Sequence, residues 1–472
     1  MPTESSYPKL DIPNIDLWAF LFERKDREFP DDKVIYTDPD TSRSYTYAQV
    51  RSTAIDFGKG LKSLWDWQKG DVLGLYTPNS IDIPAIIWGT HWAGGIISPA
   101  NPGYNVEELA FQLKDSGAKA LVTQKAFLET ARQACKKAGI EEDRIILLGD
   151  ERDETARFKH FSNGLTCLIH QAIYSGLTLV VMPAFSLEKF CQHIQDYRIT
   201  FVYAVPPVIL MLGKAPIVSN YDLSSIRMMN SGAAPLTRDL VDAVYSRLKI
   251  PIKQGYGLSE TSPTTHTQPW EEWNTTIGSV GRLLSNQTAK YMNAEDQEVP
   301  AGQTGELWIK GPNIFKGYLN NPEGTRNALT DDGYFKTGDV GHQDEKGNFF
   351  ITDRVKELIK YKGFQVPPAE LEGILLGNAD VDDVAVIGIY NKDQATEVPR
   401  AFVVPKKGVE AGKEAEERIV KWLASKVASH KRLRGGVRFI DEIPKSVSGK
   451  ILRRKLKEVA AEDEKKGLKA KL

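Results

Sequence analysis

Several residue types and patterns that mark special protein classes are scarce in this sequence. Cysteine occurs only three times in 472 residues, at Cys135, Cys167 and Cys191, and never as a CxxC pair. This excludes a disulfide framework and argues against a cysteine-ligated metal site. A hydrophobic run long enough to span a membrane is also lacking, because the most apolar stretch, residues 81–100, contains Asp82, Pro84 and His91. We therefore expect no membrane span.

An excess of charge of either sign is lacking too. The chain has 61 Lys and Arg against 62 Asp and Glu, a net charge of −1. Nucleic-acid-binding proteins and proteins that bind anionic membranes usually carry a basic excess, so neither partner is expected. The 38 Gly and 25 Pro are ordinary for a folded protein. The length exceeds the ~250–300 residues at which a single core stops growing, which predicts two or more domains.

Helix and strand patterns alternate along the first part of the chain. A helix is predicted over 47–65 after the capping residue Thr46, and a strand over 72–76. Further segments follow the same order, and the alternation resumes after residue 165. Such alternation is typical of a parallel sheet with helices on both faces. We predict an α/β fold, with a large N-terminal domain of parallel or mixed sheets over residues 1–353.

The last quarter of the chain has a different pattern. Residues 340–352 predict a hairpin that turns at 345–348. Beyond it the sequence predicts helices over 369–376 and 416–429 and strands over 384–389, 401–404 and 437–440. This favours a small α+β C-terminal domain over residues 354–472.

Four segments carry side chains suited to a nucleotide. The first, 230–236 (NSGAAPL), is a turn of small residues that lets a planar or phosphorylated ligand approach the backbone. The second, 254–263 (QGYGLSETSP), offers Tyr256 for stacking, and then a hydroxyl and a carboxylate for a phosphate and Mg²⁺. The third, 334–339, places Asp339 after a glycine turn, where a carboxylate can accept both ribose hydroxyls.

The fourth segment, 352–365 (TDRVKELIKYKGFQ), is strongly charged. Taken alone, each of the four could be a surface loop or a tight turn. In this order they resemble the adenylate-forming superfamily, which comprises acyl-CoA synthetases, 4-coumarate:CoA ligases, firefly-type luciferases and peptide-synthetase adenylation domains. The resemblance extends from residue 46 to residue 450, and residues 357–372 are most similar to the 4-coumarate:CoA ligase-like branch.

The resemblance implies an ATP-dependent acyl-CoA ligase that uses Mg²⁺ and coenzyme A and forms an acyl-AMP intermediate. The adenine site would comprise Ser231, Gly232, Ala233, Ala234, Pro235 and Tyr256, with Gly257 beside them. Glu260 would be the Mg²⁺-binding carboxylate, preceded by Ser259 where the family usually has Thr. Asp339 and Arg354 would contact the ribose and the nucleotide, and Lys356 would be the hinge between the domains.

Two lysines are implied to act in turn. Lys450 resembles the lysine that neutralises charge during adenylation, and Lys360 the one used for thioester formation after the small domain has rotated. The path of the pantetheine arm would be bordered by Lys362, Gly363 and Phe364. The acyl pocket would include Gly232, Gly257, Pro263 and Thr264, small enough for an aromatic or medium-chain carboxylic acid.

One expected part has no counterpart in the sequence. The superfamily has a Ser/Thr/Gly-rich loop whose backbone donors and hydroxyls hold the β- and γ-phosphates of ATP. Residues 158–162 resemble the region before this loop, and residues 163–165 resemble the region after it. We infer that about 80 residues are missing between Ser162 and Asn163. The large domain would then be internally shortened, and we predict that this form folds poorly or adenylates weakly.

Two other functions stay open. The chain could be a non-catalytic remnant that binds nucleotide, coenzyme A or a partner, or a peptide-synthetase-type module, which the lack of a following carrier segment disfavours. The last residues, Ala470, Lys471 and Leu472, resemble the Ser-Lys-Leu peroxisomal signal. They predict a peroxisomal import receptor as a partner and the peroxisomal matrix as the location, with the cytoplasm as the alternative.

Overall fold

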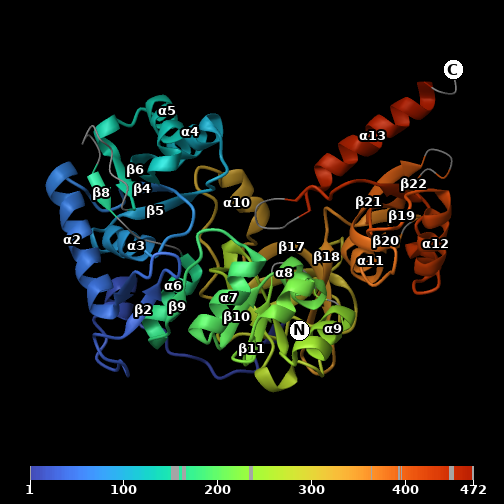
Figure 1. The fold of residues 1–472 in the computed structure, drawn as a ribbon, viewed down its shortest axis with the longest axis horizontal. Helices are drawn as coiled ribbons and strands as arrows, with labels where there is room; N and C mark the ends of the chain where they lie inside the picture. Colours follow the sequence, from blue (N-terminus) through green and yellow to red (C-terminus); the bar gives the residue numbers. More distant parts are fainter. Residues whose placement is uncertain are drawn as a thin grey trace. The chain divides into compact units, whose positions relative to one another are not determined.

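The computed structural model describes residues 2–149, 159–161, 166–232, 236, 238–362, 364–391, 394, 396–445 and 451–469. Its contacts divide the chain into two units (Figure 1). The N-terminal unit is Asp11–Tyr197, and the C-terminal unit is Met1–Leu10 together with Arg198–Leu472. No helix of the described residues has the length and apolar character needed to cross a membrane.

The N-terminal unit is built on a five-stranded sheet in which every described pair of neighbours is parallel. Its order is β5 (Ile96–Ala100), β4 (Val72–Tyr76), β6 (Ala118–Gln124), β7 (Ile145–Leu148) and β8 (Lys159–Phe161). Neighbouring residues of β6 belong to different cores, since Leu121 packs with α4 (Val106–Asp115) and α5 (Leu128–Ala138) and Val122 with α2 (Tyr47–Trp65) and α3 (Ile83–Trp92). The predicted parallel sheet with helices on both faces is confirmed.

Local sequence explains how α2 begins. The Thr46 hydroxyl accepts a hydrogen bond from the Gln49 backbone N–H at 3.3 Å, and the Gln49 side chain accepts one from the Thr46 N–H at 2.8 Å. This capping box satisfies two otherwise unpaired donors, so the helix begins where Thr46 predicts. The remaining helices of this unit are α1 (Leu17–Phe22), α6 (Thr166–Ser175) and α7 (Leu187–Tyr197).

A second, three-stranded sheet has the order β3 (Ser44–Thr46), β2 (Val34–Thr37) and β9 (Leu179–Val180). The apolar run over residues 177–182 contributes only the two residues of β9 to this sheet. The structure pairs only Leu179 and Val180 with β2, because the Thr178 hydroxyl donates to the Val34 carbonyl at 2.8 Å and the chain leaves the sheet after Val180.

Two sheets form the first part of the C-terminal unit. The first of them has the order β10 (Phe201–Ala204), β11 (Met228–Ser231), β12 (Ile252–Gly257), β13 (Thr264–Thr267) and β14 (Arg282–Leu283). Its first three strands are parallel to one another, and the remaining pairs of neighbours are antiparallel. Helices α8 (Pro206–Lys214) and α9 (Arg238–Leu248) connect the parallel strands, and α10 (Pro322–Ala328) follows later.

The other sheet is antiparallel: β1 (Thr3–Glu4), β15 (Thr288–Met292), β16 (Gly305–Lys310), β17 (Phe335–Gln343) and β18 (Phe349–Arg354). The predicted hairpin is its last pair of strands. Its turn is stabilised by the Asp344 carboxylate, which accepts hydrogen bonds from the backbone N–H groups of Lys346 and Asn348, and by Gly347, whose φ is +83°.

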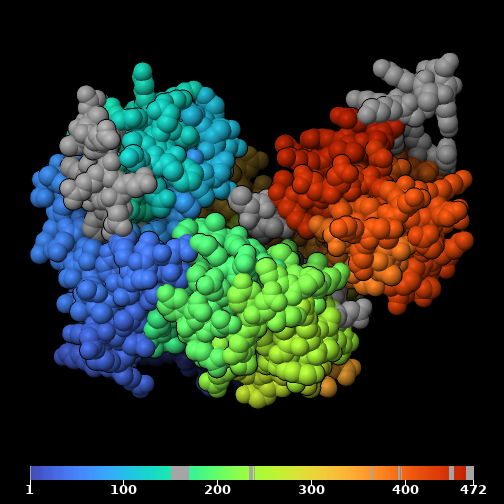
Figure 2. All heavy atoms as spheres, in the orientation of Figure 1, coloured from blue at the N-terminus to red at the C-terminus, as the bar shows by residue number. Residues whose placement is uncertain are grey.

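The small C-terminal elements follow. They are the hairpin β19 (Ile359–Tyr361) and β20 (Phe364–Val366), the sheet β21 (Val381–Asn391), β22 (Thr396–Pro405) and β23 (Val437–Phe439), and helices α11 (Pro368–Leu375), α12 (Lys413–Ala424) and α13 (Arg453–Lys469). In Figure 2 the red atoms of α13 lie against the orange atoms of this sheet, where Leu456 packs on Ile387 and Phe402. The α/β fold with a small α+β C-terminal part is confirmed, whereas the domain boundary after Asp353 stays a prediction.

Helix α12 ends five residues before the predicted limit at Ser429. The Ser425 hydroxyl donates to the Trp422 carbonyl at 2.7 Å and so takes an acceptor that a continuing helix would use. A short 3₁₀ helix over Ser429–Lys431 follows. The predicted helix end was wrong because a hydroxyl near a helix end competes with backbone N–H groups for a carbonyl acceptor. The pattern of hydrophobic residues contains no information about this competition.

Candidate adenylate site

Three of the four predicted segments meet at the carboxylate of Asp339. The side chain is 6% exposed, and Asp339 pairs with Arg354 across strands β17 and β18. The Nε of Arg354 lies 3.0 Å from Oδ1, and the Tyr256 hydroxyl donates to Oδ2 at 2.6 Å. Residues 256, 339 and 354, which the resemblance assigned to one nucleotide, therefore lie in direct contact.

The protonation states follow from burial. Burial raises the pKa of Asp339, and the Tyr256 hydrogen bond and the Arg354 charge act in the opposite direction. Burial, together with the Asp339 charge, raises the pKa of Tyr256, so its phenol remains a donor at neutral pH. A carboxylate has about four lone-pair sites. Tyr256 uses one of these sites and Arg354 another, which leaves acceptor capacity on the carboxylate that the sequence predicts to bind a ribose.

The backbone around Asp339 is held by its neighbours. The Thr337 hydroxyl accepts the Asp339 N–H at 3.0 Å and donates to the Leu307 carbonyl at 2.7 Å. Gly338, at φ +70°, donates its N–H to the Glu306 carboxylate at 2.9 Å. A side chain at position 338 would be strained at this φ, so the glycine turn fixes where the carboxylate points.

The first and second segments each contribute one buried polar atom that has no hydrogen-bond partner among the described residues. Ser231, the last residue of β11, pairs in register with Gln254 of β12, where the parallel pairing of the two strands ends, and the two residues are 1% and 4% exposed. The Oε1 of Gln254 accepts the Leu236 N–H at 3.2 Å, but neither its Nε2 nor the Ser231 Oγ has a hydrogen-bond partner among the described residues. Buried polar groups are normally paired, and ligands bind at this edge of a parallel sheet.

Gln254 was given no role from the sequence, although its position two residues before Tyr256 places it on the same face of β12. The predicted adenine residues Ala233, Ala234 and Pro235 lie outside the described residues. Gly232 follows Ser231 directly, and among the described residues a Cβ there would come within 4 Å of only the Gly255 carbonyl oxygen, at 3.4 Å.

The predicted acyl-pocket residues lie at the turn after β12. Gly257 lies opposite Thr264 on β13, and a Cβ on Gly257 would come within 1.9 Å of the Pro263 carbonyl oxygen. Only glycine fits this approach. The side chains of Pro263 and Thr264 are exposed, so they are available to a ligand.

Glu260 lies in the 3₁₀ helix Ser259–Thr261, beside the exposed Ser259. Its carboxylate accepts a hydrogen bond from the Tyr318 hydroxyl at 2.9 Å, and its carbonyl accepts the Phe315 N–H at 2.8 Å. Burial and the Glu260 carboxylate raise the pKa of Tyr318, so the phenol stays a donor. Tyr318 was missed from the sequence because it lies 58 positions away along the chain.

These residues fit a Mg²⁺ ion that is completed by a ligand. No group of three or more His, Cys, Asp or Glu side chains that could hold a metal occurs among the described residues. Mg²⁺ commonly binds through one or two carboxylates, several waters and substrate phosphates. Glu260 can supply one such carboxylate.

The predicted hinge residue Lys356 precedes the hairpin β19–β20, and the described pantetheine residues Lys362 and Phe364 belong to that hairpin. Lys356 is exposed in the turn between β18 and β19. The Thr396 hydroxyl accepts the Lys362 N–H at 2.8 Å and donates to the Lys360 carbonyl at 2.8 Å, which fixes β19 beside β22. The side chains of both lysines are exposed. Gly363 and Lys450 lie outside the described residues.

Phe364 closes this hairpin on the other strand. Its side chain is exposed, and its ring stacks on His430 with the centroids 4.6 Å apart and an interplanar angle of 17°. Phe364 thus keeps an exposed side chain whose ring is held against His430. This arrangement suits the apolar part of a pantetheine arm.

A second cluster of charges was not predicted. Arg453 at the start of α13 contacts both carboxylate oxygens of Glu372 at 2.9 Å, and its other terminal nitrogen lies 3.1 Å from Glu357. Glu372 also accepts the Val386 N–H at 2.7 Å. Burial raises the pKa of Glu372 to about 7, although Arg453 opposes this shift.

Asp353, at the end of β18, accepts the Ala369 N–H at the start of α11 at 2.9 Å and the Arg354 N–H at 2.7 Å. Burial raises its pKa to about 6. The bond to Ala369 spans the predicted hinge at Lys356, because Asp353 precedes Lys356 and Ala369 follows it.

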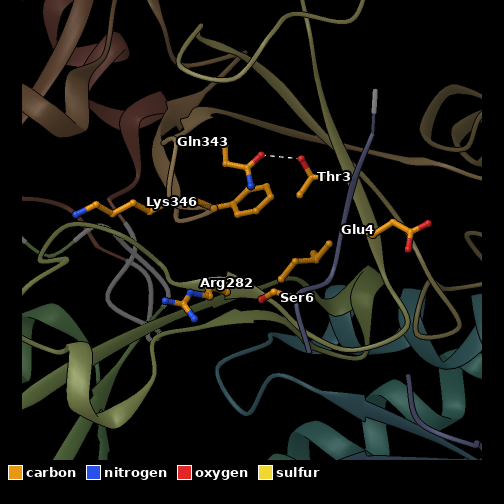
Figure 3. A pocket seen from close by; sticks show the side chains of 9 residues that line it. Thr3, Glu4, Ser6, Arg282, Gln343 and Lys346 are labelled. Atoms are coloured by element: carbon orange, nitrogen blue, oxygen red, sulfur yellow. Dashed lines mark hydrogen bonds between the residues drawn. The ribbon is translucent and has the colours of Figure 1, made fainter. Parts of the chain in front are cut away.

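A separate hollow of about 250 Å³ lies at the other end of β17 (Figure 3). It is lined by Thr3, Glu4, Ser6, Arg282, Leu283, Gln343, Lys346, Gly347 and Phe349. The Thr3 hydroxyl donates to the Gln343 side chain at 2.7 Å and so holds the N-terminal strand in place. None of the predicted site residues borders this hollow.

Comparison with known proteins gives a consistent result. Residues 22–160 and 159–319 match the model of the AMP-binding enzyme family, and residues 370–450 match that of the AMP-binding enzyme C-terminal domain. Probable 4-coumarate–CoA ligase 2 of Dictyostelium discoideum is 34% identical over 544 positions, covering 96% of this chain and 97% of the relative. 4-Coumarate–CoA ligase 1 of Petroselinum crispum is 33% identical, covering 96% of each chain.

Solved structures share the fold. The anthranilate CoA ligase AuaEII in complex with anthranoyl-AMP superimposes with a TM-score of 0.85 at 21% identity, covering 95% of this chain and 98% of that chain. A benzoate CoA ligase from Burkholderia xenovorans LB400 gives a TM-score of 0.79 at 21% identity, covering 94% and 99%.

Proposed function

The chain belongs to the AMP-binding enzyme family, and from this premise we propose that its adenylate site is retained while the adenylation step of this form is weak. By family it is an AMP-forming acyl-CoA ligase, an acid–thiol ligase that joins a carboxylic acid to coenzyme A through an acyl-AMP. The observation that carries the proposal is the buried Asp339 carboxylate, which contacts Tyr256 and Arg354 and keeps lone pairs for a ribose.

Adenylation needs positive charge around the phosphates. Attack of the carboxylate on the α-phosphate builds negative charge on that group and on the leaving pyrophosphate. Glu260 is the residue that would hold Mg²⁺, with Tyr318 fixing its carboxylate. When bound, Mg²⁺ neutralises phosphate charge. Lys450 would add a cation to the same group, and Lys360 would replace it after the small domain has rotated about Lys356.

The weak step follows from the missing phosphate loop. Two observations support a missing internal segment: the alignment with the Dictyostelium relative spans 544 positions although this chain has 472 residues, and the family model matches in two parts that meet at residues 159–160. Loss of one donor from a site that stabilises a developing charge costs about 10²–10³-fold in rate. Loss of a whole loop of donors should cost more.

The test is ATP–pyrophosphate exchange by the purified chain with Mg²⁺ and a panel of acids. We expect exchange close to the rate without enzyme, while AMP still binds. Robust exchange with any acid of the panel would refute the weak adenylation. Failure to bind AMP, in a chain with a cooperative unfolding transition, would refute the retained site.

For the substrate we propose an aromatic or medium-chain carboxylic acid. Gly232 has no side chain to fill the space beside the adenylate, and the printed names of relatives and of solved structures with this fold include 4-coumarate, anthranilate and benzoate ligases. Thr264, exposed at the turn, offers a hydroxyl to a polar substituent. Thioester formation from 4-coumarate, benzoate and octanoate adenylates would rank these classes, and a preference for acetyl-adenylate would contradict the proposal.

A second candidate, a binding protein without catalysis, is favoured by one observation. The small C-terminal part has its own cores, which include Leu371, Val386 and Ile419 in one and Phe402 and Leu456 in the other. It could therefore present a folded surface to coenzyme A or a partner protein even without turnover. Binding of coenzyme A with no thioester formed from any adenylate would support this candidate.

For the location we propose the peroxisomal matrix, with recognition of Ala470, Lys471 and Leu472 by an import receptor. These residues lie outside the described ones, so the sequence alone supports the proposal. A fluorescent protein fused before Met1, leaving the tripeptide free, should accumulate in peroxisomes. A cytoplasmic signal with the tripeptide intact would contradict it.

A further inference from the structure

We propose that the hollow at the end of β17 binds a small carboxylate anion with an apolar body, at a site apart from the nucleotide residues (Figure 3). Its volume is about 250 Å³, and all of its lining residues belong to the C-terminal unit. Gln343, the last residue of β17, lines the hollow, whereas Asp339 lies in the middle of that strand and does not.

The walls of the hollow are held by hydrogen bonds within the protein. The Thr3 hydroxyl donates to the Gln343 side chain at 2.7 Å, and the Ser5 hydroxyl donates to the Leu283 carbonyl at 2.9 Å. The N-terminal strand β1 is thereby fixed to both β17 and β14. A site whose walls are already ordered loses little conformational freedom when a ligand binds.

Two cations on one side of the hollow favour an anion. The side chains of Arg282 and Lys346 extend in the same direction, whereas that of Glu4 extends to the opposite side (Figure 3). Lys346 is exposed, and its ammonium group has three donors. The exposed Ser6 also lines the hollow, and its hydroxyl can donate to an anion.

The guanidinium of Arg282 keeps donors for such an anion. Glu272 contacts its Nη2 at 2.6 Å, but its Nε is buried and has no hydrogen-bond partner among the described residues. A guanidinium has five N–H donors, and buried donors are normally paired with protein or water. The side chain is 33% exposed, so part of it can be reached by a ligand.

The acids nearby do not line the hollow, apart from Glu4. The Asp344 carboxylate accepts hydrogen bonds from the backbone N–H groups of Lys346 and Asn348 and from the Asn348 side chain, so it is used within the turn. Glu345 is exposed at the same turn. The charges that border the hollow are therefore two cations and one carboxylate that extends away from them.

The size and the apolar part of the wall select the body of the ligand. Ligand pockets usually have about 300–1,000 Å³, so this hollow suits a small molecule. Phe349 and Leu283, both buried, form its apolar wall. A carboxylate of the size of benzoate combines a charged end for the two cations with an apolar ring for this wall, whereas free phosphate has no apolar part.

The experiment titrates the full 472-residue chain with benzoate and follows the exchange of backbone amide hydrogens, which reports where a ligand protects the chain. We expect saturable protection of residues 3–6 and 343–349 with a dissociation constant of about 1 mM. Benzamide, which has the same shape without the charge, and phosphate should bind at least about tenfold more weakly. No protection of these segments, or equal protection by benzamide or phosphate, would overturn the proposal.

Variants test whether the two cations hold the ligand. Lys346→Met, at an exposed turn, should weaken benzoate binding about three- to tenfold, and its combination with Arg282→Met should weaken it further. Lys9→Met removes an exposed lysine that does not line the hollow, so this matched control should keep the affinity. Glu4→Gln should not weaken binding. An unchanged affinity in both cation variants, or weaker binding in Glu4→Gln, would overturn the proposal.

The predicted acyl pocket is the other place at which benzoate can bind. Binding there would protect the turn at residues 257–264 and would not depend on Lys346. Protection confined to that turn would refute the hollow as a site and leave the proposed function standing. Protection of residues 3–6 and 343–349 that is weakened by Lys346→Met supports the hollow, whether or not the turn is also protected.

Discussion

Two buried carboxylates of the C-terminal unit, Asp339 and Glu372, each contact an arginine, but in different ways. Arg354 approaches Asp339 through one nitrogen at 3.0 Å, and its side chain is 55% exposed. Arg453 contacts both oxygens of Glu372 at 2.9 Å, binds Glu357 as well, and is only 16% exposed. Asp339 can therefore exchange its contact with Arg354 for a contact with a ligand. Glu372 and Arg453 cannot, because both side chains are buried against each other.

The difference shows that burial of the arginine distinguishes a pair that can bind a ligand from a pair that stabilises the fold. A buried pair such as Glu372 and Arg453, in which one arginine nitrogen contacts both carboxylate oxygens, contributes mainly through the penalty that follows when one partner is lost. A pair with an exposed cation contributes little to stability and stays available to a ligand. Asp339 and Arg354 should therefore affect nucleotide affinity, and Glu372 and Arg453 should affect the free energy of unfolding.

The largest expected effect is that of Arg453→Met. The change leaves Glu372 and Glu357 without their cation, so the free energy of unfolding at pH 8 should fall by about 3–5 kcal/mol. Urea unfolding measures it. At pH 5 the loss should be smaller, because Glu372 can take up a proton. An equal loss of unfolding free energy at both pH values would contradict the proposed role of the buried pair of Glu372 and Arg453.

The next effect concerns pH. Burial raises the pKa of Glu372 from 4.5 to about 7, so the folded chain holds an extra proton between these values. Its stability therefore falls as the pH rises through this window, and the loss is complete above the folded pKa. Asp353, with its pKa raised to about 6, acts in the same direction.

Glu372→Gln isolates this contribution. The variant keeps the shape of the side chain but does not titrate, so about 3 kcal/mol of the decline between pH 5 and pH 8 should disappear. Urea unfolding at several pH values measures the slope. Glu370→Gln, on the same helix and half-buried, is the control and should keep it. An unchanged slope for Glu372→Gln would contradict the raised pKa.

Asp339→Asn tests the other member of the comparison. It removes a charged acceptor of ribose hydroxyls, and a hydrogen bond to a charged group contributes about 1.5–3 kcal/mol. AMP affinity, measured by calorimetry, should therefore fall by about 10–150-fold, with little change in stability. Asp296→Asn, at an exposed turn with φ +54°, should change neither. Unchanged AMP affinity for Asp339→Asn would contradict the proposal that Asp339 binds the ribose hydroxyls.

Arg354→Met should have the smallest effect on stability. Because the guanidinium is more than half exposed, its loss should change the free energy of unfolding by less than about 1 kcal/mol. AMP affinity should fall several-fold. A loss of stability as large as that of Arg453→Met would remove the distinction between the two pairs.

Much of the fold could be predicted from the sequence, because helix caps and the period of apolar residues are local features of the chain. Thr46 and the period of apolar residues predict α2, and alternating patterns predict the parallel sheet. The residues that meet at Asp339 were predicted through a resemblance, in which the order of the motifs stands for their proximity in space. The helix limit at Ser429 was wrong, because a single hydroxyl at Ser425 ends α12 earlier.

The residues that were missed are defined by tertiary contacts. Tyr318 reaches Glu260 across 58 positions, and Arg453 reaches Glu372 across 81. No periodicity links such distant residues, and a charged side chain in a basic helix is usually solvated. The Ser231 Oγ and the Gln254 Nε2, which have no hydrogen-bond partner in the described part of the chain, could likewise be recognised only once their burial was known.

The central claim is that the adenosine half of the site is retained and the triphosphate half is lost. Calorimetric titration of the purified chain with AMP and with ATP plus Mg²⁺ tests it most directly. The account predicts that AMP binds and that ATP binds no more than about threefold tighter. Binding of ATP at least tenfold tighter than AMP, or binding of neither nucleotide by the folded chain, would contradict it.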